Sequence, residues 1–227
     1  MIPVDPVDLS DPRPYAALVY YSHVVLGCVG LLAAVMALIF RKGSRAHMYA
    51  GRVFSMMTVV ICVTSLAMLS VKMAPPLLVA ALTAMYAVVT GLLALRQATA
   101  GVRRLEYALC GFELAVVGVF LSMAIPQVAA GRIPPIGPAV ILAIPLILLA
   151  GDINFFLKRA HRQELRVQRH LARMIWAFVI SVRAPLAEIY QYLNIPVLVI
   201  LFGPLVVAPI MIWLFRRRLS RSAGAVA

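Results

Sequence analysis

Residues 136–159 read IGPAVILAIPLILLAGDINFFLKR, and this stretch decides the fold. Up to residue 157 it carries a single charged side chain, Asp152, and two cations follow at once, Lys158 and Arg159. A helix crosses the hydrocarbon core of a bilayer with about 20 apolar residues, because each residue advances the helix by about 1.5 Å. Basic residues directly after such a run are typical of a transmembrane helix that ends on the cytoplasmic side.

Six other runs have the same character. They cover residues 16–40, 48–73, 76–96, 105–129, 169–191 and 195–215. Together with residues 136–157 they predict an all-α integral membrane bundle of about seven transmembrane helices. Short connections favour one domain over 16–215, after a short irregular extracytoplasmic leader at 1–15 and before a basic cytoplasmic tail at 216–227.

The composition excludes a soluble globular enzyme. Of the 227 residues, 63% are hydrophobic and 13% are charged, whereas soluble domains average about 45–50% apolar and about a quarter charged residues. The net charge of +13 lies in short basic clusters between the apolar runs rather than on one face. We therefore expect membrane lipid, and no nucleic acid, as the partner of these charges.

The basic clusters also predict the orientation of the chain. They follow the first, third and fifth apolar runs and the last one, whereas the other connections hold few cations. Because Lys and Arg are enriched in cytoplasmic loops, the N-terminus is predicted outside and the C-terminus in the cytoplasm.

One layer of polar residues is predicted at the cytoplasmic boundary. Its members are His47, Arg52, Asp152, Asn154, His161, Arg169, His170 and Arg173. Imidazoles on two helices at one depth are suited to ligate a metal, with Asp152 as a third ligand, or the iron of a b-type haem whose propionates pair with the arginines. Two alternatives are an anionic ligand or lipid head group bound by the same layer, and a solvated basic belt without a ligand.

A second set of polar residues lies deeper in the predicted spans. Ionisable groups at membrane depth are costly unless they are paired or hydrated, so each one marks a candidate site. His23, Arg183 and Glu188 are predicted near the outer side, and Glu113 lies well inside the hydrocarbon. A path through Glu113, His23 and Arg183 would suit a small ion or solute, and the alternative is a set of structurally satisfied side chains.

Several blocks resemble an uncharacterised bacterial family of predicted multi-pass membrane proteins, a domain of unknown function. The blocks are KGSRAHMYAGRVFSMM at 42–57, GDINFFLKR at 151–159 and RHLARMIWAFVIS at 169–181. Their HxxxGR and RHxxRM patterns and the preceding span match at His23, His47, Gly51, Arg52, Asp152, His170, Arg173 and Met174. The resemblance implies a protein of the bacterial cytoplasmic (inner) membrane and transfers no established activity.

Three functional hypotheses follow from the sequence. The first is haem or metal binding with a redox role at the His47 and His170 layer. The second is transport of a small ion or solute. The third is a non-catalytic accessory or assembly subunit of a membrane complex. As protein partners we expect either such a complex or further copies of this chain in a homo-oligomer.

Overall fold

The computed structural model describes residues 15–158, 162–189 and 192–224, and this part of the chain contains seven α-helices and no strand. The helices are α1 (Ala17–Ile39), α2 (Arg45–Val71), α3 (Pro75–Ala94), α4 (Ala100–Ala129), α5 (Ile136–Leu157), α6 (Arg162–Ile189) and α7 (Val197–Gly224). The predicted all-α class is confirmed. The predicted leader falls almost entirely on residues 1–14, outside the described residues.

Six of the helices are long and apolar enough to cross a membrane, and the chain is a multi-pass membrane protein. The exception is α6, where the sequence predicts a span over 169–191. Its first half carries many charged side chains, among them Arg162, Arg169 and Arg173. Arg169 and Arg173 are buried inside the protein, which is where charged groups of membrane helices normally lie.

Helix ends differ from the prediction where polar residues start or extend a helix. Helix α4 begins at Ala100 because the Thr99 hydroxyl accepts a hydrogen bond from Val102 N, and Ser44 caps α2 in the same way through His47 N. Such N-caps satisfy backbone N–H groups that have no partner within the helix. The sequence prediction followed only the apolar runs and therefore also missed the continuation of α7 to Gly224.

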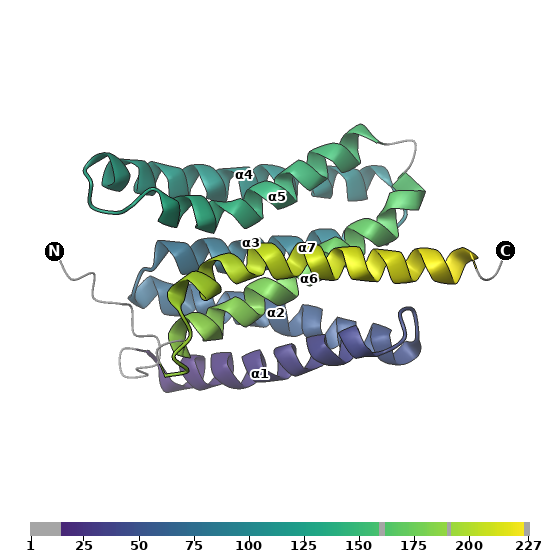
Figure 1. Ribbon diagram of the computed structural model, residues 1–227, viewed down its shortest axis with the longest axis horizontal. Coiled ribbons are helices and arrows are strands. Elements are labelled where there is room, and N and C mark those ends of the chain that lie inside the picture. Colours follow the sequence, from purple (N-terminus) through teal and green to yellow (C-terminus); the bar gives the residue numbers. More distant parts are fainter. Residues whose placement is uncertain (1–14, 159–161, 190–191, 225–227) are drawn as a thin grey trace.

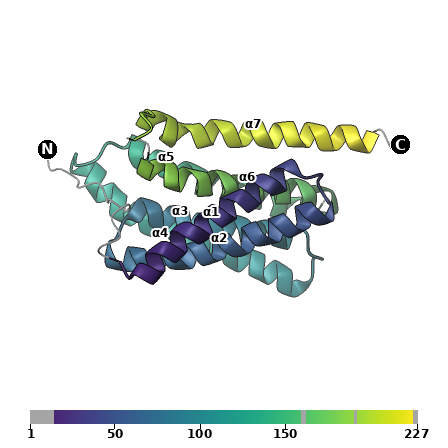
Figure 2. The ribbon, with the colours of Figure 1, turned by 90° about the horizontal axis from the view of Figure 1, so that it is seen from below.

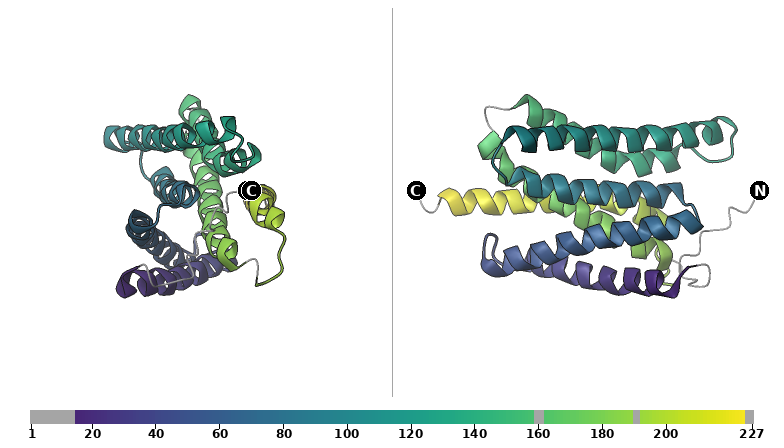
Figure 3. Two further views of the ribbon diagram at one scale, coloured as in Figure 1. Left: turned by 90° about the vertical axis from the view of Figure 1, so that its left-hand side faces the viewer. Right: turned by 180° about the vertical axis from the view of Figure 1, so that it is seen from behind.

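Helices α3 and α6 form the centre of the bundle. Helix α3 contacts α2, α4, α5 and α6. The pair α1 and α2 packs on one side and the pair α4 and α5 on the other, as the end view in Figure 3 shows. Helix α7 lies outside this arrangement, along α6 and α5 (Figure 2). Large apolar side chains remain exposed on the outer helices, for example Leu18, Leu32 and Leu114, and would contact membrane lipid.

Successive helices run in opposite directions, so the basic connections gather at one end of the molecule. The α1–α2, α3–α4 and α5–α6 connections lie at the same end as the C-terminus (Figure 1). Lys42 at this end donates hydrogen bonds to the carbonyls of Ala37 and Leu38 and so caps α1. Burial, and then the nearby Arg218, lower the pKa of Lys42 below its usual value.

We expect this basic end to face the cytoplasm. A green fluorescent protein fused after residue 227 should then be fluorescent, and an alkaline phosphatase fused at the same point should be inactive, because each reporter folds on one side of the membrane only. The opposite pair of results would contradict the predicted orientation.

Candidate functional site

A cluster of buried polar and charged side chains joins four helices in the half of the bundle nearer the basic end. Its members, here called the buried ion cluster, are Tyr86 on α3, Glu106 on α4, Asp152 on α5, and Arg162, Arg169 and Arg173 on α6. The local sequence places the three arginines on one side of α6, since Arg162, Arg169 and Arg173 follow each other at intervals of seven and four residues. Asp152 lies one turn and a half before the end of α5.

Glu106 joins α4 to two arginines of α6. Arg162 donates two hydrogen bonds to it, from Nη1 to Oε2 at 2.9 Å and from Nη2 to Oε1 at 3.0 Å. Arg169 Nη1 donates to Oε1 at 2.6 Å. The pair of parallel bonds from Arg162 is the bidentate geometry that guanidinium and carboxylate groups favour.

Asp152 is the centre of the cluster and is completely buried, with an exposed fraction of 0%. Its Oδ1 accepts from Arg169 Nη2 at 2.7 Å and from Arg173 Nη2, and its Oδ2 accepts from the Tyr86 hydroxyl. Arg173 Nη2 also donates to the carbonyl of Leu148 at 2.6 Å. Both oxygens of Asp152 therefore have donors, and the carboxylate is held in place from two helices.

The cluster carries more positive than negative charge, because three arginines face two carboxylates. Aromatic rings offset part of the excess, since the guanidinium carbon of Arg169 lies 4.1 Å from the Phe155 ring centre and that of Arg173 lies 4.9 Å from that of Tyr86. Such contacts attract a cation to the ring face. Arg173 Nη1 is nevertheless buried without a hydrogen-bond partner among the described residues.

A crevice of about 420 Å³ lies beside the buried ion cluster, between α5, α6 and α7. Four cationic side chains line it, Lys158, Arg169, Arg173 and Arg216, and no acidic side chain of the described residues does. Its other polar lining residues are Asn154 and Gln168, and its deeper end is apolar, with Trp176. We name this space the basic crevice. Its charge and size suit an anion.

Glu113 lies deeper in the membrane than Glu106, on the same face of α4. Both residues are buried, as expected from their spacing of seven residues. The Thr83 hydroxyl of α3 donates to Glu113 Oε1 at 2.7 Å, and Glu113 Oε2 has no partner among the described residues. Glu113 is thus hydrogen-bonded to a neighbouring helix and does not belong to the buried ion cluster.

His47 and His170 come from α2 and α6, and the ring of each contacts a backbone carbonyl. His47 Nδ1 contacts the carbonyl of Ala37 at 2.9 Å, and His170 Nδ1 contacts that of Gly91 at 3.0 Å. Neither histidine lines the basic crevice. Asp152, predicted as a third metal ligand, is instead bound to arginines.

The described part of the chain contains no group of three or more His, Cys, Asp or Glu side chains that could hold a metal ion. Arg52 is exposed on α2, whereas Arg173 is buried against Asp152. The structure thus joins three residues of the predicted inner layer, Asp152, Arg169 and Arg173, and pairs His47 and His170 with backbone carbonyls. His161 lies outside the described residues.

The deeper residues of the sequence analysis lie apart from this cluster. His23 Nδ1 contacts Thr64 Oγ1 of α2 at 3.0 Å. Arg183 is half-buried on α6 and has no ion pair among the described side chains, and the side chain of Glu188 lies outside them. No described hydrogen bond joins Glu113, His23 and Arg183, so the contacts lend no support to a transport path through the three.

Comparison with protein families, with curated proteins and with solved structures found no match. The resemblance to a bacterial membrane-protein family therefore stays a prediction from the sequence blocks.

Sequence reasoning missed the partners that complete the site. Neither Glu106 nor Tyr86 is among the candidate residues that the sequence analysis singles out. The available signal was the surplus of arginines at the start of α6, which need buried acids, together with an acid two turns inside α4. The residues that meet could not be identified without knowing that α4, α5 and α6 are neighbours.

Proposed function

We propose that this membrane protein binds an anionic ligand in the basic crevice between α5, α6 and α7. The observation that carries the proposal is the lining of this crevice by four cations and no acid. The anion would be a phosphate-like group, either of a free solute or of a lipid head group, because the two present the same chemistry to arginine.

The buried ion cluster supports this role by fixing the wall of the crevice. Arg169 and Arg173 are held by Asp152 and by the carbonyl of Leu148, so they need little reordering when a ligand arrives. Fixed donors in a site of low dielectric constant bind an anion more strongly than flexible ones in water. Lys158 and Arg216 are exposed and would complete the contact from the basic end.

The experiment uses the full chain in nanodiscs of two compositions. In zwitterionic lipid, inorganic phosphate is titrated and the melting temperature is followed, because a ligand that binds only the folded state raises it. In discs that contain phosphatidylglycerol, native mass spectrometry counts retained lipid. Stabilisation by phosphate identifies a free anion, whereas selective retention of phosphatidylglycerol identifies a head group. If phosphate does not stabilise the protein and phosphatidylglycerol is not selectively retained, the proposal is contradicted.

Removing two cations from the crevice should weaken binding about tenfold, or about 1.4 kcal/mol. The test variant is Lys158→Gln/Arg216→Gln, which leaves the buried ion cluster intact. Its matched control is Arg103→Gln/Arg104→Gln, with the same charge change on exposed residues of α4 away from the crevice. Equal weakening in both variants would point to general surface charge instead.

A second candidate function is haem binding by His47 and His170, and the contact that each ring makes with the backbone supports it. Each Nδ1 is held by a backbone carbonyl, which is the outer contact that ligating histidines usually make and which leaves Nε2 for iron. Bound haem would supply electron-transfer chemistry, and the two histidines would orient it.

This second candidate predicts a visible spectrum. Purified protein reconstituted with haemin and reduced with dithionite should show Soret and α bands that are lost in His47→Ala and in His170→Ala and are retained in His23→Ala. A colourless protein after reconstitution would remove the candidate without affecting the crevice.

A further inference from the structure

A second hollow lies on the other side of the bundle, between α1, α2, α3 and α6. It has a volume of about 330 Å³ and is lined mainly by apolar side chains, such as Leu31, Ile61, Met68, Leu77 and Ile180. We name it the outer cavity because most of its lining lies in the half of the bundle away from the basic end. No residue of the buried ion cluster lines it.

His23 brings a polar atom to the outer cavity. The hydrogen bonds of its ring indicate whether this atom is a donor or an acceptor. The Thr64 hydroxyl lies 2.9 Å from the carbonyl of Ile61 and 3.1 Å from that of Val60, so its single proton is donated to the backbone. In the tautomer that carries its proton on Nδ1, His23 donates to Thr64 Oγ1, which lies 3.0 Å away. In the neutral imidazole this leaves Nε2 without a proton, as a hydrogen-bond acceptor.

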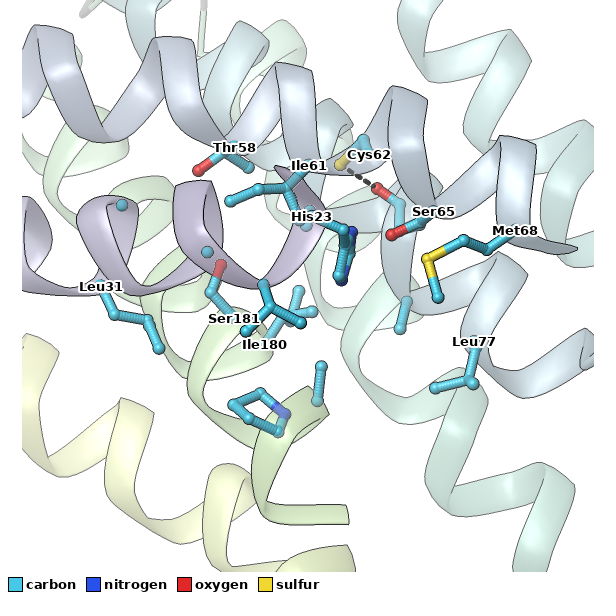
Figure 4. A pocket seen from close by; sticks show the side chains of 18 of the residues that line it. His23, Leu31, Thr58, Ile61, Cys62, Ser65, Met68, Leu77, Ile180 and Ser181 are labelled. Carbon is cyan, nitrogen blue, oxygen red and sulfur yellow. Dashed lines mark hydrogen bonds between the residues drawn. The ribbon is translucent and has the colours of Figure 1, made fainter. Parts of the chain in front are cut away.

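A hydroxyl group also lines the outer cavity. Ser65 lines the outer cavity and makes no hydrogen bond to another described residue. Figure 4 shows the His23 ring and the Ser65 side chain among the residues that line this cavity, with Leu31 toward one end of the view and Met68 and Leu77 toward the other. The other labelled hydroxyls are occupied, since Thr58 donates to Phe54 O and Ser181 to Ala177 O.

We propose that the outer cavity binds a neutral, membrane-soluble molecule that carries a hydroxyl group, of the class of long-chain or prenyl alcohols and phenols. The ligand hydroxyl would donate to His23 Nε2 and accept from Ser65, while its apolar body fills the space between Leu31 and Leu77. A charged ligand is disfavoured because no ionised side chain lines the cavity. A plain acyl chain would leave both polar groups without a partner, which costs free energy in an apolar site.

The ligand test compares two probes on the full chain in nanodiscs. One is a dodecanol with a diazirine at mid-chain, and the other is its methyl ether, which cannot donate a hydrogen bond. After photolysis, labelled residues are mapped by mass spectrometry. We expect the alcohol to label α1 and α2 residues of the outer cavity at least fivefold more than the ether does, and unlabelled dodecanol to compete. Equal labelling by both probes would mean that the site takes any alkyl chain and would overturn the proposal.

Two variants locate the effect. Gly27 lines the outer cavity, and a Cβ added there meets no atom within 4 Å, so Gly27→Met should fill the space without strain and reduce cavity labelling at least fivefold. Gly118→Met is the matched control, since Gly118 is exposed on α4 with equally open surroundings, and it should leave labelling unchanged. His23→Phe should reduce the alcohol to the level of the ether. Unchanged alcohol labelling in Gly27→Met would overturn the proposal, and the competition by dodecanol decides it if that variant does not fold.

Discussion

Replacing Asp152 with asparagine is expected to lower the free energy of unfolding by about 3–5 kcal/mol, because breaking a buried ion pair leaves its partner charged and unpaired. Asp152 is completely buried and accepts hydrogen bonds from two arginines and from Tyr86. Asparagine has nearly the same shape, so the substitution removes the charge without making a cavity. Only Glu106 would then remain to offset the three cations of α6.

Thermal unfolding in detergent measures this effect. Glu164→Gln is the matched control, because it removes one acidic charge from an exposed position of the same bundle end and should change stability by less than about 1 kcal/mol. The double variant Asp152→Asn/Arg173→Met should recover part of the loss, since it also removes one of the uncompensated cations. Equal melting temperatures for Asp152→Asn and the control would contradict the role of the ion cluster.

The fold was largely predictable because the bilayer restricts the chain so strongly. A helix satisfies its own backbone hydrogen bonds in lipid, so each long apolar run had to become a helix. Residues 136–157 match α5 at both ends. The prediction failed where this restriction ends, at the polar starts of α4 and α6, because caps and buried ion pairs set those boundaries instead.

For the site, the sequence predicted only the depth of its residues in the membrane. Asp152, His170 and Arg173 were assigned to one layer from their positions along the helices, but depth does not say which helices are neighbours. Asp152 therefore appeared as a metal ligand beside histidines, whereas it binds Arg169 and Arg173. A short-range pattern cannot show this, because the partners are separated by 17 and 21 residues and lie on different helices.

Replacing Gly91 is expected to disturb the same cluster from the opposite side. Gly91 lies where α3 and α6 are tightly packed, and an added Cβ would lie 2.9 Å from Arg173 Cβ and 3.5 Å from Met174 Sδ. Small residues permit such close packing of membrane helices. Gly91→Ala is therefore expected to cost about 1–3 kcal/mol through overpacking, and Gly91→Leu should prevent folding.

Gly51→Ala is the matched control, because Gly51 lies within α2, in its second turn, and a Cβ there meets nothing within 4 Å. Alanine favours a helix over glycine by about 1 kcal/mol, so this control should be neutral or slightly stabilising. A similar small gain for Gly91→Ala would show that α3 and α6 are free to separate there.

The strongest form of this prediction is a double-variant cycle. Any shift of α6 caused by Gly91→Ala moves Arg173, whose guanidinium is held by Asp152 and by the carbonyl of Leu148. Part of the cost of Gly91→Ala is then the loss of those bonds, which Asp152→Asn has already weakened. The two losses should fall short of additivity by about 0.5–3 kcal/mol. Strictly additive losses would mean that the close contact of α3 and α6 and the buried ion cluster stabilise the bundle independently, and that Arg173 does not connect them.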